Sequence, residues 1–290
     1  MSQTPRIFDQ RLQNLNKKIY IEIIEDFRKL PYGDQDKLIQ ELRSIYGPHF
    51  DFSEEYLGRL LTNPSLRTAI VTLARERKSG RLVSVIMVPA YTFELNDNDH
   101  SLENRYSAGH GILVVDEKYR MGGLTSLMTD VTENILFTIF PNENWVEYGF
   151  MISPYSFYYV STRSKMSVPS DKPVDPNVMR LFNKIKSTVA IRARKYGNEP
   201  YVMSVFPPVK NDLDFLYENM DRLPKTLKYY VDKTGLVPGV GILTMQICYL
   251  VKGNTINLPA GDYIKKRYKY NGQINYIQGN PTYSIPVPKI

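Results

Sequence analysis

The chain has 290 residues, 42% of them hydrophobic and 23% charged, which suits a soluble globular protein with a buried core. It contains no apolar run of about 18 residues and no apolar signal-peptide core near its start, so we expect a cytoplasmic protein without a membrane span. The net charge of +7 indicates affinity for anions. One cysteine, Cys248, and three scattered histidines exclude the usual structural zinc patterns, so no metal is expected.

The first part of the chain is predicted to be helical. Apolar residues three or four positions apart predict amphipathic helices over residues 13–30 and 34–46, and a shorter helix is expected within 51–66. Two strand-like stretches, 68–75 and 82–93, then flank a glycine-containing turn and predict a hairpin. A polar loop follows at 95–104.

The next stretch predicts a strand, a glycine turn and a helix in succession. Residues 112–115 are apolar and mostly β-branched, a charged segment follows, and Gly122-Gly123 comes next. From there the apolar spacing changes to that of a helix face, at Leu124, Leu127, Met128, Val131, Ile135 and Leu136. A helix start presents N–H groups without intrahelical partners and a partial positive charge, so this turn is a candidate phosphate cradle.

The turn is neither a Walker loop nor a dinucleotide fingerprint, since G-x-x-x-x-G-K-[ST] is absent from the chain and G-x-G-x-x-G does not follow the strand. Instead, Arg120-Met121-Gly122-Gly123-Leu124-Thr125 resembles the [RQ]-x-x-G-x-[GA] motif of the GNAT superfamily of acyl-CoA-dependent N-acetyltransferases. The usual run-in, V-x-P-x-[YF]-R, is matched at Val115, Tyr119 and Arg120. The chain departs from the pattern at Glu117, where proline is frequent, and at Thr125, where glycine or alanine is usual.

The resemblance implies an α/β fold with a mixed, largely antiparallel central sheet flanked by helices. It also implies an acyl-CoA such as acetyl-CoA as cosubstrate, and an amine acceptor that attacks the thioester in a ternary complex. The pantetheine arm would pair with main-chain groups near Leu113 and Val115, and the pyrophosphate would lie on the N–H groups of residues 121–125. The implied cofactor-binding residues are Leu113, Val114, Val115, Arg120, Met121, Gly122, Gly123, Leu124 and Thr125.

A strand is predicted at residues 145–152, and Ser153-Pro154 then forms a favourable helix start. In the superfamily a tyrosine of this helix commonly protonates the thiolate leaving group, which indicates Tyr159 first and Tyr158 second. Glu147 is the best-placed carboxylate for a general base.

The remaining segments are predicted as a linker, helices and strands. The linker is at 169–175, helices at 176–196 and 212–223, strands at 201–206, 225–232 and 241–251, and short edge strands within 258–290. The glycines of 238–243 indicate a turn rather than a second cofactor loop. We therefore expect N-terminal helices (1–66), an acyl-CoA-binding core (67–168) and an extended C-terminal part (175–290) that completes the sheet or binds the acceptor or a partner.

Two other functions fit parts of the sequence. An acyltransferase of the same fold can take its acyl group from an acyl carrier protein, as acyl-homoserine-lactone synthases do, and a basic face would suit an acidic carrier. A non-enzymatic nucleic-acid-binding protein is the other alternative, because residues 265–270 interleave basic and aromatic side chains. A solvated edge strand explains that segment better, so nucleic acid is not expected as a partner.

Overall fold

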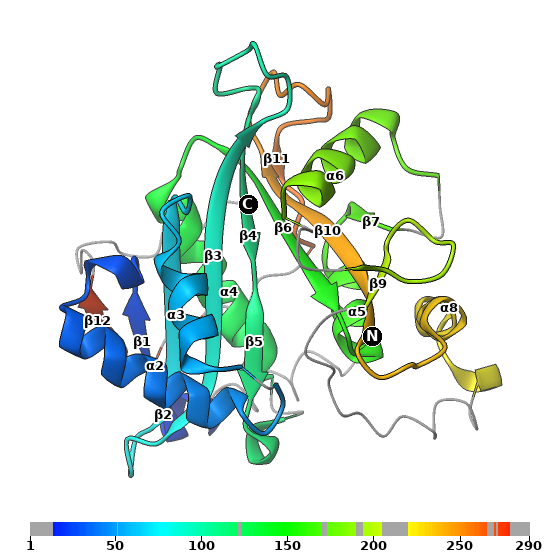
Figure 1. Cartoon of the computed structure of the whole chain (residues 1–290). Helices are drawn as coiled ribbons and strands as arrows, with labels where there is room; N and C mark the ends of the chain where they lie inside the picture. The colour runs from blue at the N-terminus through cyan, green and yellow to red at the C-terminus, as the bar shows by residue number, and fades with distance from the viewer. Residues whose placement is uncertain are drawn as a thin grey trace, which may run out of the picture. The chain divides into compact units, whose positions relative to one another are not determined.

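The computed structural model describes residues 14–50, 52–120, 123–169, 173–189, 194–204, 220–265, 270 and 272–278 (Figure 1). The chain divides into two compact units. The first comprises residues 1–91, 110–141 and 267–290, and the second comprises 92–109 and 142–266. Each unit combines mostly antiparallel strands with helices, so the predicted fold class is confirmed.

The strands of the first unit are paired in the order β12-β1-β2-β3, and β5 is added to β3. The pairs are antiparallel except that of β12 with β1, which is parallel. The bounds are β1 Ile19–Ile24, β2 Thr68–Glu76, β3 Leu82–Glu94, β5 Ile112–Val115 and β12 Ile274–Gln278. The predicted hairpin is confirmed by the pairing of β2 with β3.

Helices lie against both faces of this sheet. They are α2 (Tyr32–Tyr46), α3 (Glu54–Thr62) and α4 (Leu124–Ile139), with short 3-10 turns η1 (Phe27–Lys29) and η2 (Glu117–Tyr119). Successive residues of a strand point to opposite faces. On β2, Val71 packs in one core cluster with Leu42 of α2 and Leu57 of α3, whereas its neighbour Thr72 accepts a hydrogen bond from Thr132 of α4 at 2.9 Å.

The helix predicted over residues 13–30 is wrong. Residues 14–18 are helical, but the chain then enters strand β1. Ile19, Ile21 and Ile23 are fully buried and alternate along the strand, which pairs with β2 on one edge and β12 on the other. Residues four apart share a face in a strand as well as in a helix, so the spacing of Ile19 and Ile23 could not distinguish the two. Pairing with distant strands decided the outcome.

The second unit contains strands paired in the order β4-β6-β10-β9-β8, with β7 and β11 also on β10. The strands are β4 Arg105–His110, β6 Asn144–Met151, β7 Ser167–Val168, β8 Arg194–Lys195, β9 Val202–Ser204, β10 Val240–Leu250 and β11 Gly261–Asp262. Its helices are α5 (Pro154–Arg163), α6 (Pro176–Val189) and α8 (Lys225–Thr234), with a 3-10 turn η4 at Met220–Arg222. The strands predicted at 145–152 and 241–251 are therefore confirmed, as is the helix that follows Ser153.

Alternate residues of β10 face different helices of this unit. Met245 packs in a cluster with Tyr106 of β4 and Phe182 of α6. Ile242 packs instead with Phe157 of α5 and Tyr230 of α8. The second unit is thus also covered on both faces of its strands.

Two predictions in this part need correction, and a third is largely untested. The strand predicted at 225–232 is helix α8, whose buried residues Leu227, Tyr230, Val231 and Thr234 follow a helical period. The helix predicted at 176–196 ends at Val189 in α6, and Arg194–Lys195 forms β8. Most of the helix predicted at 212–223 lies outside the described residues. Gly239 adopts a positive φ of 77° before β10, so the glycines of 238–243 form a turn into a strand, as predicted.

The C-terminal part of the chain contributes strands to both units. β10 pairs with β6 in the second unit, and β12 pairs with β1 in the first. Within the described residues, every helix is too short or too polar to cross a bilayer.

The hydroxyl of Tyr46 provides a test of how the first unit is held together. Tyr46 ends α2, is fully buried, and donates a hydrogen bond at 2.7 Å to the carbonyl of Ile112 on β5. Replacing Tyr46 by phenylalanine removes this donor from a buried carbonyl, so we expect the free energy of unfolding to fall by about 1–2 kcal/mol. Urea denaturation of the purified protein measures this change.

Tyr32→Phe is the matched control, because Tyr32 lies at the start of the same helix and is 79% exposed. Its stability should stay within about 0.5 kcal/mol of the parent. Equal effects of the two substitutions would contradict a specific role for the Tyr46 hydrogen bond.

Candidate functional site

Strand β5 presents main-chain groups on the edge that faces away from β3. The Asp116 N–H donates to the Val83 carbonyl at 2.8 Å, and Ser84 lies opposite Val115. Hydrogen-bonded and non-hydrogen-bonded pairs alternate in an antiparallel ladder. The N–H and C=O groups of Leu113 and Val115 therefore point away from β3.

The side chains and inward carbonyls of β5 hold the strand in the first unit. Ile112 and Val114 belong to its main core cluster. The carbonyl of Ile112 accepts from Tyr46, and that of Val114 accepts from the Ser84 hydroxyl at 2.8 Å. These contacts fix the strand on its β3 side and do not use the outward groups of Leu113.

A short capped turn follows the strand. The Asp116 carboxylate accepts from the Lys118 N–H at 2.9 Å, and the Tyr119 N–H donates to the Asp116 carbonyl at 2.9 Å, which forms η2. Aspartate is favourable at this position because its side chain can bond the main chain two residues ahead. The turn therefore has its own local signal in the sequence.

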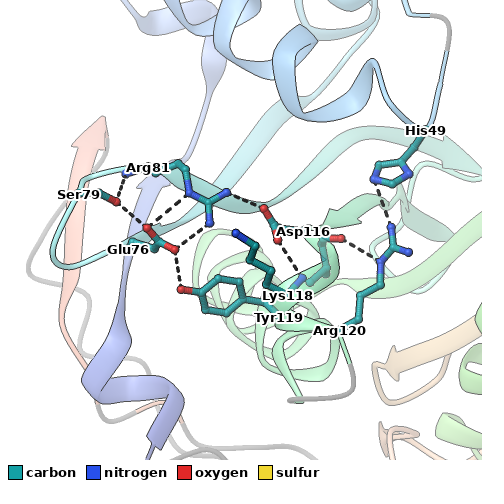
Figure 2. Close-up of polar contacts among 9 residues, drawn as sticks. His49, Glu76, Ser79, Arg81, Asp116, Lys118, Tyr119 and Arg120 are labelled. Atoms are coloured by element: carbon teal, nitrogen blue, oxygen red, sulfur yellow. Dashed lines mark hydrogen bonds and ion pairs between the residues drawn. The ribbon is translucent and has the colours of Figure 1, made fainter.

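A network of charged hydrogen bonds connects this turn to the β2–β3 hairpin (Figure 2). Arg81 donates to Glu76 at 2.7 Å and to Asp116 at 2.6 Å. Glu76 also accepts from the hydroxyls of Ser79 at 2.6 Å and Tyr119 at 2.9 Å. Hydrogen bonds between charged partners are stronger than neutral ones, so the network fixes the turn relative to the hairpin.

The network changes the acid–base properties of its members. Hydrogen bonds from Arg81, Ser79 and Tyr119 lower the pKa of Glu76 to about 2. Burial, with a further contribution from Glu76, raises the pKa of Tyr119 to about 12. At neutral pH Glu76 is therefore a carboxylate and Tyr119 a protonated phenol, which suits a supporting role rather than proton transfer.

Arg120, the cationic residue of the motif, extends from the end of this turn. Its Nε donates to the Val115 carbonyl at 3.2 Å, and its Nη2 lies 3.2 Å from Nε2 of His49 (Figure 2). Glu117 lies 3.5 Å from Nη1 and is 79% exposed. The guanidinium is itself half-exposed and is held beside the outward edge of β5.

Helix α4 follows its N-cap residue Gly123, which adopts a left-handed conformation with φ of 88°. The Leu127 N–H donates to the Gly123 carbonyl at 3.0 Å, and Gly123, as the N-cap, has no side chain that could cap the helix start. Leu124 is buried while Thr125 is exposed. The start of α4 thus has the features of an anion site. Of the predicted cofactor residues, Met121 and Gly122 lie outside the described residues.

The body of α4 confirms the predicted apolar face. Leu124, Leu127, Met128, Val131, Ile135 and Leu136 are all at most 3% exposed. The helix is anchored along its length, so its N-terminus keeps a fixed direction in the first unit.

The three predicted catalytic residues lie in the second unit. Tyr158 of α5 is 39% exposed, whereas Tyr159 is half-buried, with its ring 5.6 Å from the Arg163 guanidinium carbon. Glu147 of β6 accepts a hydrogen bond from Gln246 on β10 and lies 3.8 Å from Arg163. Glu147 and Tyr159 therefore share Arg163 as a neighbour.

The first unit brings together the described cofactor residues, and the second brings together Glu147 and Tyr159. That the two sets form one active site stays a prediction. The sequence analysis did not predict the hydrogen-bond network of Glu76 and Arg81 or the contact of His49 with Arg120. Asp116 was a local sequence signal for the turn. The contact between His49 and Arg120 had no such signal, because the two residues are 71 positions apart and no spacing pattern connects them.

Comparison with protein-family models gives no match, and comparison with curated proteins gives none either. Solved structures do match. The GNAT family N-acetyltransferase YhbS from Escherichia coli, in complex with CoA, is 14% identical, with 49% of this chain and 66% of that chain covered and a TM-score of 0.33. A probable N-acyltransferase from Enterococcus faecalis is 10% identical, with 51% and 33% covered and a TM-score of 0.34.

An aminoglycoside acetyltransferase from an uncultured soil metagenomic sample, in complex with sisomicin, is 14% identical. The match covers 64% of this chain and 98% of that chain, with a TM-score of 0.30. The chain spans less than two thirds of the Escherichia coli protein and a third of the Enterococcus faecalis protein.

His110, two residues before β5, makes the stability of the fold sensitive to pH. Burial lowers the pKa of His110 to about 4 from its ordinary value of 6.5. The unfolded chain binds this proton near pH 6.5, but the folded chain does so only near pH 4. The free energy of unfolding should therefore fall as the pH decreases across this window, by on the order of 1–3 kcal/mol from this residue.

Urea denaturation between pH 7 and 4 measures this loss, and His110→Gln should reduce it because glutamine does not titrate. His100→Gln is the control, since the His100 side chain is 75% exposed. Parallel pH profiles for the parent and the His110 variant would contradict the assignment.

Proposed function

We propose that the chain is an N-acyltransferase that moves an acetyl or other acyl group from acyl-CoA to an amine acceptor. The observation that supports this most is a pair of main-chain surfaces in one unit. One is the outward edge of β5 at Leu113 and Val115, and the other is the start of α4, whose N-cap is the left-handed Gly123 without a side chain of its own. Arg120 lies on the segment between them.

Each surface suits one part of acyl-CoA. The amides of a pantetheine arm can pair with a strand edge as an additional strand would. A diphosphate suits a helix start, where N–H groups point outward and the helix dipole is positive. Arg120 adds a full positive charge beside the edge of β5, where its Nε donates to the Val115 carbonyl, and its position in the motif resembles that of the superfamily's arginine.

The reaction needs an amine nucleophile and a thiolate leaving group. The neutral amine attacks the thioester carbonyl, the new C–N bond forms, the C–S bond breaks, and the amine loses a proton. We assign protonation of the departing thiolate to Tyr159, with Tyr158 as the second candidate. Tyr159 is favoured because its half-buried ring lies beside Arg163, whose charge stabilises electron density on the phenol oxygen.

Glu147 is the candidate base. Its contacts with Gln246 and Arg163 stabilise the carboxylate form, so it would be charged and able to accept a proton from the acceptor ammonium, directly or through water. We place the acceptor with the residues outside 67–168, which include helices α2 and α3 and the C-terminal part.

Binding of coenzyme A tests the proposal directly. Gly123→Val should weaken the affinity for coenzyme A by at least tenfold in isothermal titration calorimetry, because a branched side chain occupies the position where main chain and phosphate approach. Acetyl transfer from acetyl-CoA to a panel of amines should fall in parallel.

Gly80→Val is the matched control for backbone strain. Gly80 also has a positive φ, of 70°, and lies in the β2–β3 turn, where an added Cβ meets no atom within 4 Å. Both variants should lose about 1–2 kcal/mol of stability, but the Gly80 variant should keep its affinity for coenzyme A. A parent protein that binds an acyl carrier protein but not coenzyme A would favour the carrier-dependent alternative.

The assignment of Tyr159 is tested by steady-state kinetics. Tyr159→Phe should lower kcat by about tenfold to a hundredfold while the affinity for coenzyme A changes little, because the phenol acts on the leaving group. Tyr155→Phe is the control on the same helix, where Tyr155 is 52% exposed. Unchanged turnover in the Tyr159 variant, with loss in Tyr158→Phe, would move the role to Tyr158.

A further inference from the structure

His49 contacts Arg120 from a distant part of the sequence, with Nε2 of His49 3.2 Å from Nη2 of Arg120. It follows helix α2, and its N–H donates to the Tyr46 carbonyl at 2.8 Å. Tyr46 in turn donates to Ile112 of β5. The main chain of His49 is therefore attached to the same strand that leads into the turn bearing Arg120.

The contact between His49 and Arg120 defines the protonation state of the imidazole. Guanidinium nitrogens are donors only, so a hydrogen bond between Nη2 of Arg120 and Nε2 of His49 requires a lone pair on Nε2. The imidazole is then neutral, with its proton on Nδ1. Burial and the charge of Arg120 lower the pKa of His49, while Glu117 and Asp116 act weakly in the opposite direction.

A neutral acceptor has a specific advantage at this position. A buried carboxylate partner would cancel the charge of Arg120 and compete with a bound anion for its donors. A neutral imidazole orients the guanidinium and leaves its positive charge available. The acidic neighbour, Glu117, is largely exposed, so solvent screens its effect.

We propose that His49, in its neutral form, is a positioning residue that holds the guanidinium of Arg120 for the diphosphate of acyl-CoA. The proposal rests on the proposed function. Protonation of His49 would place two cations against each other and release Arg120 from this orientation. The affinity for coenzyme A would then depend on pH through a residue that does not itself bind the cofactor.

A double-mutant cycle with coenzyme A as the probe tests this role. His49→Ala should weaken binding by about threefold to tenfold, the usual effect of one hydrogen bond. His49→Gln should restore most of the affinity, because its amide oxygen can accept from Arg120. In an Arg120→Ala background, His49→Ala should have no further effect. Glu117→Gln is the control for the exposed partner and should change the affinity by less than about twofold.

The pH dependence separates positioning from direct binding. As the pH falls from 7 to 5, the parent should lose affinity relative to His49→Gln, which does not titrate. A relative gain would mean that protonated His49 binds the phosphates itself, and it would overturn the proposal. NMR of the imidazole nitrogens, simple in a chain with three histidines, should show Nε2 without a proton at neutral pH.

The outcomes distinguish this inference from the function on which it rests. If the parent binds coenzyme A and His49→Ala binds it as tightly, only the inference is overturned. If the parent does not bind coenzyme A, the proposed function fails and the inference fails with it. A protonated Nε2 at neutral pH in the NMR experiment would overturn the inference whatever the binding result.

Discussion

The hydrogen-bond ladder between β3 and β5 is the constraint on which the candidate site depends. Its register directs the main-chain groups of Leu113 and Val115 away from the sheet, and a shift by one residue would direct them to β3 instead. Buried contacts enforce this register: Ile112 and Val114 pack in the core, and their carbonyls accept from Tyr46 and Ser84. The outward direction of these groups is thus a consequence of the contacts that hold the opposite edge of β5.

Local features of the sequence were sufficient for this part of the molecule. The change of apolar period at Leu124, the glycine that adopts a positive φ at 123, and the capping Asp116 all act over a few residues. Prediction failed where distant pairing decided the structure. Strand β1 is formed by hydrogen bonds to β2 and β12, and the spacing of Ile19 and Ile23 is compatible with either a helix or a strand.

The contacts that support the turn and Arg120 could not be predicted from the sequence for the same reason. Arg81 meets Asp116 across 35 positions of sequence, and His49 meets Arg120 across 71. Neither pair has a motif, because each depends on the path of β3 and α2 through the fold. The residues of the motif could be predicted from the sequence pattern, whereas the residues that orient them are identified only in the three-dimensional structure.

The two arginines of this region show how a protein can use the same side chain for different purposes. Arg81 is bonded to two carboxylates, Glu76 and Asp116, so its charge is balanced within the network and its effect is to fix the turn. Arg120 is bonded to the Val115 carbonyl and contacts His49, and its acidic neighbour Glu117 is largely exposed, so its charge is less fully balanced than that of Arg81. A structural arginine gains from charged acceptors, which give the strongest hydrogen bonds. An arginine that must bind an anion gains from neutral ones, because any negative charge already present would reduce its attraction for the ligand.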